Sequence, residues 1–119
     1  MTGKRAHKIW DPAMECMSRD ERHALQGRRL REVVRRVYDN VPVYRARMDA
    51  KGVKPEDIRT ADDIVLLPFT EKADLRDNFP YGLFAAPKSE IVRIQGSSGT
   101  TGKPTVVGYT KHDVDVWTQ

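Results

Sequence analysis

The sequence predicts an α+β fold, in which a helical N-terminal subdomain of residues 1–75 is followed by the first strands of a larger α/β domain in residues 76–119. Two observations predict it. Apolar residues recur at helical spacing between residues 18 and 42, and residues 89–95 and 105–110 have the patterns of short strands. The chain has 119 residues, the size of one modest domain.

The segment from residue 18 to 42 is predicted to be the longest helix. Ser18 and Glu21 stand three residues apart and form a capping box, in which each side chain accepts a hydrogen bond from the other's backbone N–H. Asn40-Val41-Pro42 ends the helix, because proline cannot continue it. One apolar face follows the helical period: Leu25, Leu30, Val33, Val34, Val37, Tyr38 and Val41.

Four shorter segments follow this helix. Residues 43–52 predict a second helix with Gly52 as its left-handed stop, and residues 54–58 predict one helical turn. Residues 60–68 open on a Thr60/Asp63 cap pair, and residues 70–80 open on Thr70. The last three segments are too short to be stable alone, so we expect them to pack against something larger.

The C-terminal part predicts two strands and a further helix. Thr110 and Asp113 cap a helix over residues 111–119, whose Val114, Val116 and Trp117 are expected to face a core. Two strands and a newly capped helix have no further sheet to join. The sequence is therefore expected to be a fragment of a longer protein.

Composition and charge exclude several classes of protein. No run of 18 apolar residues exists, and the N-terminus has no apolar signal region, so we expect a cytoplasmic protein that does not cross a membrane. Cys16 is the only cysteine, which excludes an internal disulfide and a multi-cysteine metal site. Residues 1–47 hold 12 Lys and Arg against 6 Asp and Glu, whereas residues 48–119 hold 9 against 11.

The basic N-terminal half leaves a nucleic-acid-binding module open as an alternative function. A row of arginines on the first long helix could contact phosphates: Arg28, Arg29, Arg31, Arg35 and Arg36. No nucleic-acid reading motif accompanies them, and no aromatic residues interleave with them. A solvated helix face, or one that packs against acidic residues of the same protein, is the favoured interpretation.

The glycine-rich stretch of residues 96–104 is the strongest candidate for a binding site. Glycines allow successive backbone N–H groups to converge on an anion, four hydroxyls add donors, and Lys103 supplies positive charge. It is not a Walker loop, because Lys103 is followed by Pro104, and no Gly-x-Gly-x-x-Gly is present. A plain hairpin turn or linker of Gly, Ser and Thr is the structural alternative.

Residues 97–104 resemble the phosphate loop of the adenylate-forming superfamily of acyl- and aryl-CoA synthetases. Further segments are similar to the N-terminal part of phenylacetate-coenzyme A ligases: "WDP" at Trp10, "YDNVPVYR" at the end of the long helix, and "LPFTEKADLRDNFPYGLFAAP" before the strands. The resemblance extends from about Trp10 to Trp117 and implies that residues 76–119 begin an AMP-binding adenylating domain.

This resemblance implies a two-step reaction in phenylacetate catabolism. An aryl acid and Mg²⁺-bound ATP give an acyl adenylate and pyrophosphate, and coenzyme A then displaces AMP to form a thioester. The residues implied to hold the β- and γ-phosphates are Ser97, Ser98, Gly99, Thr100, Thr101, Gly102 and Lys103. Donors that converge on the leaving pyrophosphate would stabilise the charge that develops on it.

Members of this family run to several hundred residues, so the catalytic residues, the magnesium-binding glutamate and the aryl-acid pocket are expected beyond Gln119. We expect the 119-residue chain alone to be inactive and its missing C-terminal remainder to be its main partner. A separately encoded subunit that complements such a remainder stays an alternative, and association into a homo-oligomer through exposed strand edges stays open.

The other reactive side chains have ordinary structural interpretations. His7, His23 and His112 lack metal-ligand spacing, and no base is placed for Cys16. Asp113 is better explained as a helix cap than as a metal ligand. We expect Trp10 and Trp117 to be packing residues rather than a stacking platform. Tyr81, Phe84 and Tyr109 are expected in the core, with a role in a substrate pocket as the alternative.

Overall fold

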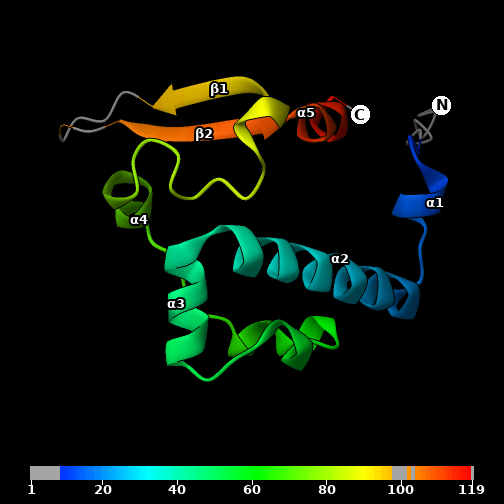
Figure 1. The fold of residues 1–119 in the computed structure, drawn as a ribbon. Coiled ribbons are helices and arrows are strands. Elements are labelled where there is room, and N and C mark those ends of the chain that lie inside the picture. Colours follow the sequence, from blue (N-terminus) through cyan, green and yellow to red (C-terminus); the bar gives the residue numbers. More distant parts are fainter. Residues whose placement is uncertain (1–8, 98–101, 103, 119) are drawn as a thin grey trace.

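The computed structural model describes residues 9–97, 102 and 104–118. A short helix α1 (Pro12–Glu15) precedes the long helix α2 (Arg19–Asn40), which runs across the middle of the molecule. Helix α3 (Pro42–Ala50) and the 3₁₀ segments η1 (Pro55–Asp57) and η2 (Ala61–Leu66) lie on one side of α2. The β-hairpin lies on the other side (Figure 1).

The C-terminal half supplies this hairpin and its neighbours. Helix α4 (Lys72–Asp77) and the 3₁₀ turn η3 (Lys88–Glu90) precede strands β1 (Ile91–Ser97) and β2 (Thr105–Thr110), and helix α5 (Lys111–Trp117) follows them. The two strands form one antiparallel sheet. The predicted α+β fold is confirmed. Within the described residues, no helix is long and apolar enough to cross a membrane.

The capping box of α2 is formed as the sequence predicts. The backbone N–H of Glu21 donates to Ser18 Oγ at 3.2 Å, and the N–H of Ser18 donates to Glu21 Oε2 at 2.9 Å. At the other end Val41 is extended, and Pro42 becomes the first residue of α3, where its missing N–H costs no hydrogen bond. Gly52 ends α3 with a φ of +68°, as expected.

The hydrophobic core lies where α2, α3 and the chain around η1 meet. Its buried residues are Val34, Met48, Val53 and Ile58, and Leu30, Tyr38, Tyr44 and Leu67 pack around them. The predicted apolar face of α2 is only partly covered, because Val34 is 2% exposed whereas Val33 is 53% exposed. An apolar groove of about 490 Å³ remains between α2 and the segment from Leu67 to Leu83.

Gly27 has a packing role that its place in a helix does not reveal. It is buried, and a Cβ built on it would lie 3.3 Å from the Ala61 nitrogen and 3.5 Å from Thr60. The chain that enters η2 therefore crosses close over α2 at this point. The Thr60/Asp63 cap pair fixes that chain, since both the N–H and the hydroxyl of Thr60 donate to Asp63.

The predicted start of the 70–80 segment is wrong by one residue. Glu71, not Thr70, is the N-cap of α4, and its N–H donates to Asp74 Oδ2 at 2.8 Å. Asp74 stands three residues after Glu71 and can accept this bond within one turn, whereas Ala73, three residues after Thr70, has no acceptor side chain. Arg47 of α3 donates to the same carboxylate.

The expected core positions of several aromatic residues are wrong. Trp10 is 82% exposed, Trp117 is 59% exposed and Tyr81 is 38% exposed, whereas Phe84 and Tyr109 are half-buried. The expected inward face of α5 is also mostly open, with Val116 57% exposed. Trp117 instead packs against Tyr109, with ring centroids 5.5 Å apart.

Candidate functional site

The glycine-rich stretch joins the two strands of the hairpin. Ser97 is the last residue of β1, Thr105 is the first residue of β2, and the two face each other in the antiparallel register. Of the predicted phosphate-binding residues, the structure describes Ser97 and Gly102. The others lie outside the described residues: Ser98, Gly99, Thr100, Thr101 and Lys103.

Gly102 has a backbone conformation that only glycine adopts readily. Its φ is +103°, and a Cβ built on it would meet nothing within 4 Å. The glycine is therefore required by the backbone angle and not by crowding. This observation agrees with the prediction that the stretch needs glycine for its conformation.

The hydroxyls of Ser97 and Thr105 are hydrogen-bonded to each other across the hairpin. Ser97 is exposed and Thr105 is half-buried. The sequence-based list of site residues includes Ser97 and does not include Thr105.

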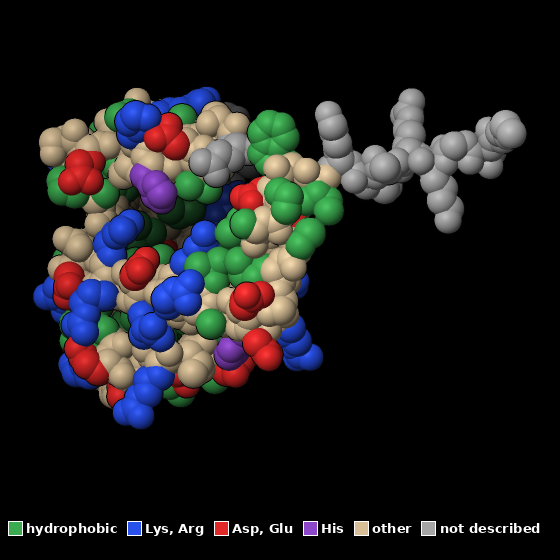
Figure 2. Space-filling view, turned by 90° about the vertical axis from the view of Figure 1, so that its right-hand side faces the viewer, with side chains coloured by type: hydrophobic (Ala, Val, Ile, Leu, Met, Phe, Trp, Pro, Cys, Tyr) green, Lys and Arg blue, Asp and Glu red, His purple; other side chains and the backbone are tan. Residues whose placement is uncertain are grey.

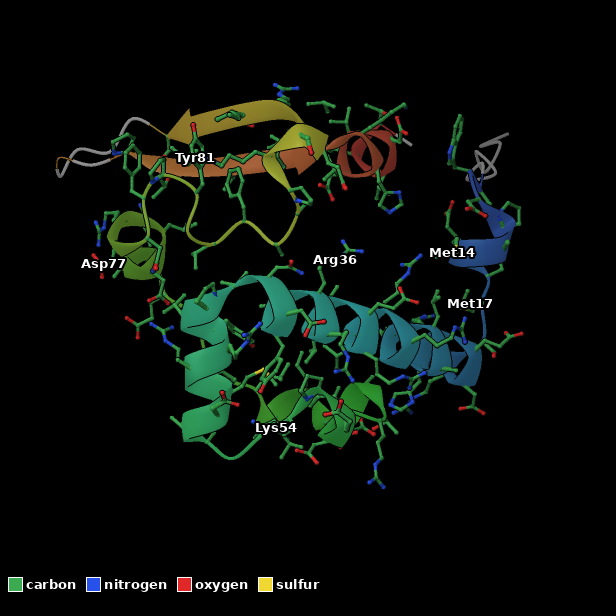
Figure 3. All side chains as sticks on the ribbon, viewed as in Figure 1. Met14, Met17, Arg36, Lys54, Asp77 and Tyr81 are labelled. Atoms are coloured by element: carbon green, nitrogen blue, oxygen red, sulfur yellow. The ribbon has the colours of Figure 1, made fainter. Side chains whose placement is uncertain are left out.

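A pocket lies between α2, the hairpin and α5. It has a volume of about 270 Å³ and is lined by Arg36 of α2, by Phe84 and Gly108, and by Asp113 of α5. Arg36 points from α2 towards the hairpin and α5 (Figure 3). Figure 2 shows that the molecular surface is hollowed on the side that it presents, between its upper and lower parts.

Asp113 serves as a helix cap within this pocket, as the sequence predicts. The N–H and the hydroxyl of Thr110 each donate to Asp113 Oδ2 at 2.8 Å. These hydrogen bonds, the backbone one first, hold the pKa of Asp113 below its ordinary value, with smaller contributions from the charges of His112 and Arg36. The carboxylate therefore serves to cap the N-terminus of α5.

No group of three or more His, Cys, Asp or Glu side chains comes together within the described residues. His23 pairs with Asp62 at 3.2 Å, and Cys16 is exposed. The described side chains thus do not fit a protein-built magnesium site, and no Mg²⁺ ligand is assigned to them.

The arginine face of α2 is partly occupied by contacts within the chain. Arg31 donates to the carbonyl oxygen of Arg59, and Arg35 donates to the carboxylate of Glu56. Basic and acidic side chains are interspersed on the face shown in Figure 2. These contacts favour the interpretation of a helix face that packs against its own chain over that of a nucleic-acid surface.

Sequence similarity to known proteins covers most of the chain and not only the glycine-rich stretch. No protein-family model matches the chain. Phenylacetate-coenzyme A ligase of Aromatoleum evansii is 55% identical over 104 residues, and that of Escherichia coli is 53% identical over 107 residues. The ligase of Thermus thermophilus is 49% identical over 111 residues. The chain spans 24 to 25% of the length of these relatives, and 87 to 93% of the chain is matched.

Solved structures agree with the sequence comparison. A 2-hydroxyisobutyryl-CoA ligase in complex with 2-HIB-AMP and CoA, in the thioesterification state, superimposes with a TM-score of 0.78 at 32% identity. That match covers 87% of this chain and 23% of the ligase. The postadenylation state of the ligase matches 95% of this chain with a TM-score of 0.77 and 28% identity. In sequence, the chain is thus similar to the N-terminal portion, about a quarter, of the phenylacetate-coenzyme A ligases, and in fold it is similar to about a quarter of a 2-hydroxyisobutyryl-CoA ligase.

Proposed function

We propose that this chain acts as the N-terminal part of a phenylacetate-coenzyme A ligase and contributes the loop that binds the ATP polyphosphate. One observation carries the proposal: identity of 49 to 55% to curated ligases of this kind covers about nine tenths of the chain. Identity at that level, over that share of the chain, supports the same use of the glycine-rich stretch.

The proposed role of the loop is electrostatic. Ser97, Gly102 and the residues between them would surround the β- and γ-phosphates with backbone N–H groups and hydroxyls, and Lys103 would supply a positive charge. When the carboxylate of the aryl acid attacks the α-phosphorus, negative charge builds up on the departing pyrophosphate. Donors already in place stabilise that charge without a cost of reorganisation at the moment of reaction.

The other components of the reaction would come from outside the described residues. ATP would enter as its Mg²⁺ complex, and coenzyme A would accept the acyl group in the second step. The aryl-acid pocket, the magnesium ligand and the residues of the chemical steps would belong to the three quarters of the ligase that this chain does not match. A cytoplasmic location is part of the proposal, because ATP and coenzyme A are used there. Because the pocket and these residues would lie outside the matched quarter, we expect the 119-residue chain alone to have no ligase activity.

A chimera tests the proposal. The matching N-terminal portion of the Escherichia coli ligase is replaced by this chain, and phenylacetate-dependent ATP-pyrophosphate exchange and thioester formation are measured. We expect both activities in the chimera and neither in the 119-residue chain. Lys103→Ala in the chimera should lower kcat/KM by about 10² to 10³-fold, the effect of removing one donor to a developing oxyanion.

A matched variant controls for the loss of a positive charge. Lys111 lies on α5, is mostly exposed, and pairs with Asp115 four residues on at 2.8 Å. Lys111→Ala should therefore leave both activities within about twofold, since exposed pairs contribute little. A folded chimera without activity would contradict the proposed function. Equal effects of the two lysine variants would contradict the role of the loop.

A further inference from the structure

Helix α2 carries an apolar stripe that the hydrophobic core does not cover. Val34 is 2% exposed and belongs to the core, whereas its neighbour Val33 is 53% exposed. Leu30, Val33 and Val37 recur at helical spacing, so they lie on one side of α2. They line the apolar groove of about 490 Å³ between α2 and the segment from Leu67 to Leu83. This α2 groove includes six apolar side chains: Leu30, Val33, Val37, Val41, Leu75 and Leu83.

A second hollow continues the uncovered surface towards η2. It has a volume of about 390 Å³, and Leu30 and Val33 line both this hollow and the α2 groove. Ile64 of η2 also lines the second hollow and is 58% exposed. The open apolar surface therefore extends from α4 across α2 to η2.

The far wall of the α2 groove is fixed to α3. Tyr44, which itself lines the groove, donates its hydroxyl proton to the carbonyl oxygen of Pro68 at 3.3 Å. Arg47 donates to the carbonyl oxygen of Phe69 at 3.2 Å and to the carboxylate of Asp74 at 2.7 Å. These bonds hold the chain that leads into α4. The groove is thus a formed feature of the fold, which can receive a partner without a change of the backbone.

The groove has the make-up of a protein–protein interface. Most of its lining side chains are apolar, and its polar members Thr70, Glu71 and Lys72 are exposed. An apolar centre with a polar rim is the common arrangement where two protein surfaces pack. Within the described part of the chain, no buried side-chain nitrogen or oxygen lacks a hydrogen-bond partner. The groove therefore presents no buried polar atom for a polar small molecule to satisfy, which favours an apolar occupant.

The matched proteins indicate where that occupant comes from. The fold of this chain recurs in a 2-hydroxyisobutyryl-CoA ligase with a TM-score of 0.78, and the match covers 23% of that ligase. The phenylacetate-coenzyme A ligases are matched over 24 to 25% of their length. In these proteins most of the polypeptide lies outside the matched part and is covalently joined to it. Its effective concentration at the groove therefore far exceeds that of a separate partner.

We propose that the α2 groove is the docking surface for the part of the ligase beyond the matched quarter, and that it receives apolar side chains of that part. The inference rests on the proposed function, because it requires such a remainder. Removal of the groove's apolar side chains from water is the favourable contribution that drives this packing. Side chains that are exposed in the 119-residue chain, Val33 above all, are buried in the complete enzyme.

The test compares the 119-residue chain with the chimera that carries the remainder of the Escherichia coli ligase. Val33→Cys places a thiol in the groove, and Glu32→Cys places one at an exposed position of α2 outside it. Cys16 is exposed, so both variants also carry Cys16→Ser. Reaction with a maleimide is followed by mass spectrometry of the peptides that contain the introduced cysteine. Circular dichroism checks that each protein is folded.

The two cysteines should respond differently to the remainder. In the 119-residue chain we expect them to react at rates within about threefold of each other, because both positions are exposed. In the chimera Val33→Cys should react about tenfold or more slowly than in the chain, whereas Glu32→Cys should change by less than about threefold.

The other outcomes separate this inference from the proposed function. An active chimera in which Val33→Cys reacts as fast as in the chain would overturn the inference alone. Slow reaction of Val33→Cys in the chain alone would also overturn it. If dilution then restores the rate, a second copy of the chain fills the groove. A chimera that does not fold would overturn both, since the chain would not fit the remainder.

Stability gives an independent measurement of the same burial. Val33→Ser replaces an apolar side chain by a polar one of similar helix propensity. In the 119-residue chain Val33 is half exposed, so we expect a small change in melting temperature. In the chimera we expect a fall of several degrees, because the substitution places an uncompensated hydroxyl in a packed interface. Equal shifts in the two proteins would contradict docking at the groove.

Discussion

Asp74 of α4 accepts two hydrogen bonds from the guanidinium group of Arg47 in α3. Nη1 of Arg47 lies 2.7 Å from Oδ2, and Nη2 donates to Oδ1. The same carboxylate caps α4 through the N–H of Glu71, and Arg47 also donates to the carbonyl of Phe69 at 3.2 Å. Asp74 is 7% exposed. One pair therefore joins α3 to the segment that leads towards the hairpin.

This pair predicts a pH dependence of stability. The hydrogen bond from Arg47, followed by that from Glu71, lowers the pKa of Asp74 from 3.8 to about 2. The pKa is lower in the folded chain, so the carboxylate stabilises the fold at neutral pH. This stabilisation is lost as the pH falls through the window from 3.8 towards 2. Melting temperatures measured between pH 7 and pH 2 should show this loss of stability. In the Asp74→Asn variant most of this pH dependence should be absent.

Asp77 provides the matched control for that prediction. It is an exposed carboxylate on the same helix, so Asp77→Asn makes the same chemical change away from Arg47. At pH 7 we expect Asp74→Asn to lower the melting temperature by several degrees, because Arg47 loses its charged partner, while Asp77→Asn has little effect. Coincident pH profiles of the two variants would show that the pair does not carry the effect.

Gly27 is predicted to resist substitution although it lies within a helix. A Cβ at Gly27 would meet the backbone of Ala61 at 3.3 Å. Gly27→Leu would force that backbone away from α2, and we expect a loss of about 1 to 3 kcal/mol in the free energy of unfolding. Denaturant unfolding measures it. Ala24→Leu, at an exposed position of the same helix, should change stability by less than about 0.5 kcal/mol.

The caps show which parts of the fold the sequence can predict. Ser18 with Glu21 and Thr110 with Asp113 form reciprocal bonds, and Thr60 donates its N–H and its hydroxyl to Asp63. Each pair lies three residues apart, so both partners belong to one turn and need no tertiary contact. The strands and the α+β class were predictable for the same reason, since periodicity is a local property.

The remainder depends on residues that are far apart in the chain. Arg47 and Asp74 are separated by 27 positions, so no local pattern reveals the contact that joins α3 to α4. The exposure of Trp10 was not predictable either. The hydrophobicity of a side chain indicates that burial is favourable, but it does not indicate whether another segment of the fold covers that side chain. The contact of Ser97 with Thr105 required the strand register, which the sequence pattern did not specify.

Gly108 and Phe84 predict a coupling that two substitutions can measure. A Cβ at Gly108 would lie 2.5 Å and 2.6 Å from atoms of the Phe84 ring. Gly108→Ala should therefore displace the ring and cost about 1 to 3 kcal/mol in the free energy of unfolding. In a Phe84→Ala background the ring is absent, and the same change should cost much less. Additive losses would contradict the close packing of the ring on the strand.

Two glycines of the glycine-rich stretch, Gly96 and Gly102, provide a further test of its conformation. Gly102 has a φ of +103°, in a region that side chains rarely adopt, whereas a Cβ at Gly96 would meet only the Thr105 carbonyl oxygen at the ordinary distance of 3.8 Å. Gly102→Ala should distort the loop at a cost of about 1 to 3 kcal/mol. Triphosphate affinity should then fall by about tenfold or more, since 1.4 kcal/mol corresponds to a factor of ten. Gly96→Ala, which adds the same methyl group in a strand, should change affinity by less than about twofold.

Calorimetric titration of both variants with inorganic triphosphate gives the comparison. If they bind equally well, the backbone angle at Gly102 does not control anion binding; if both bind weakly, the hairpin rather than the loop angle is at fault.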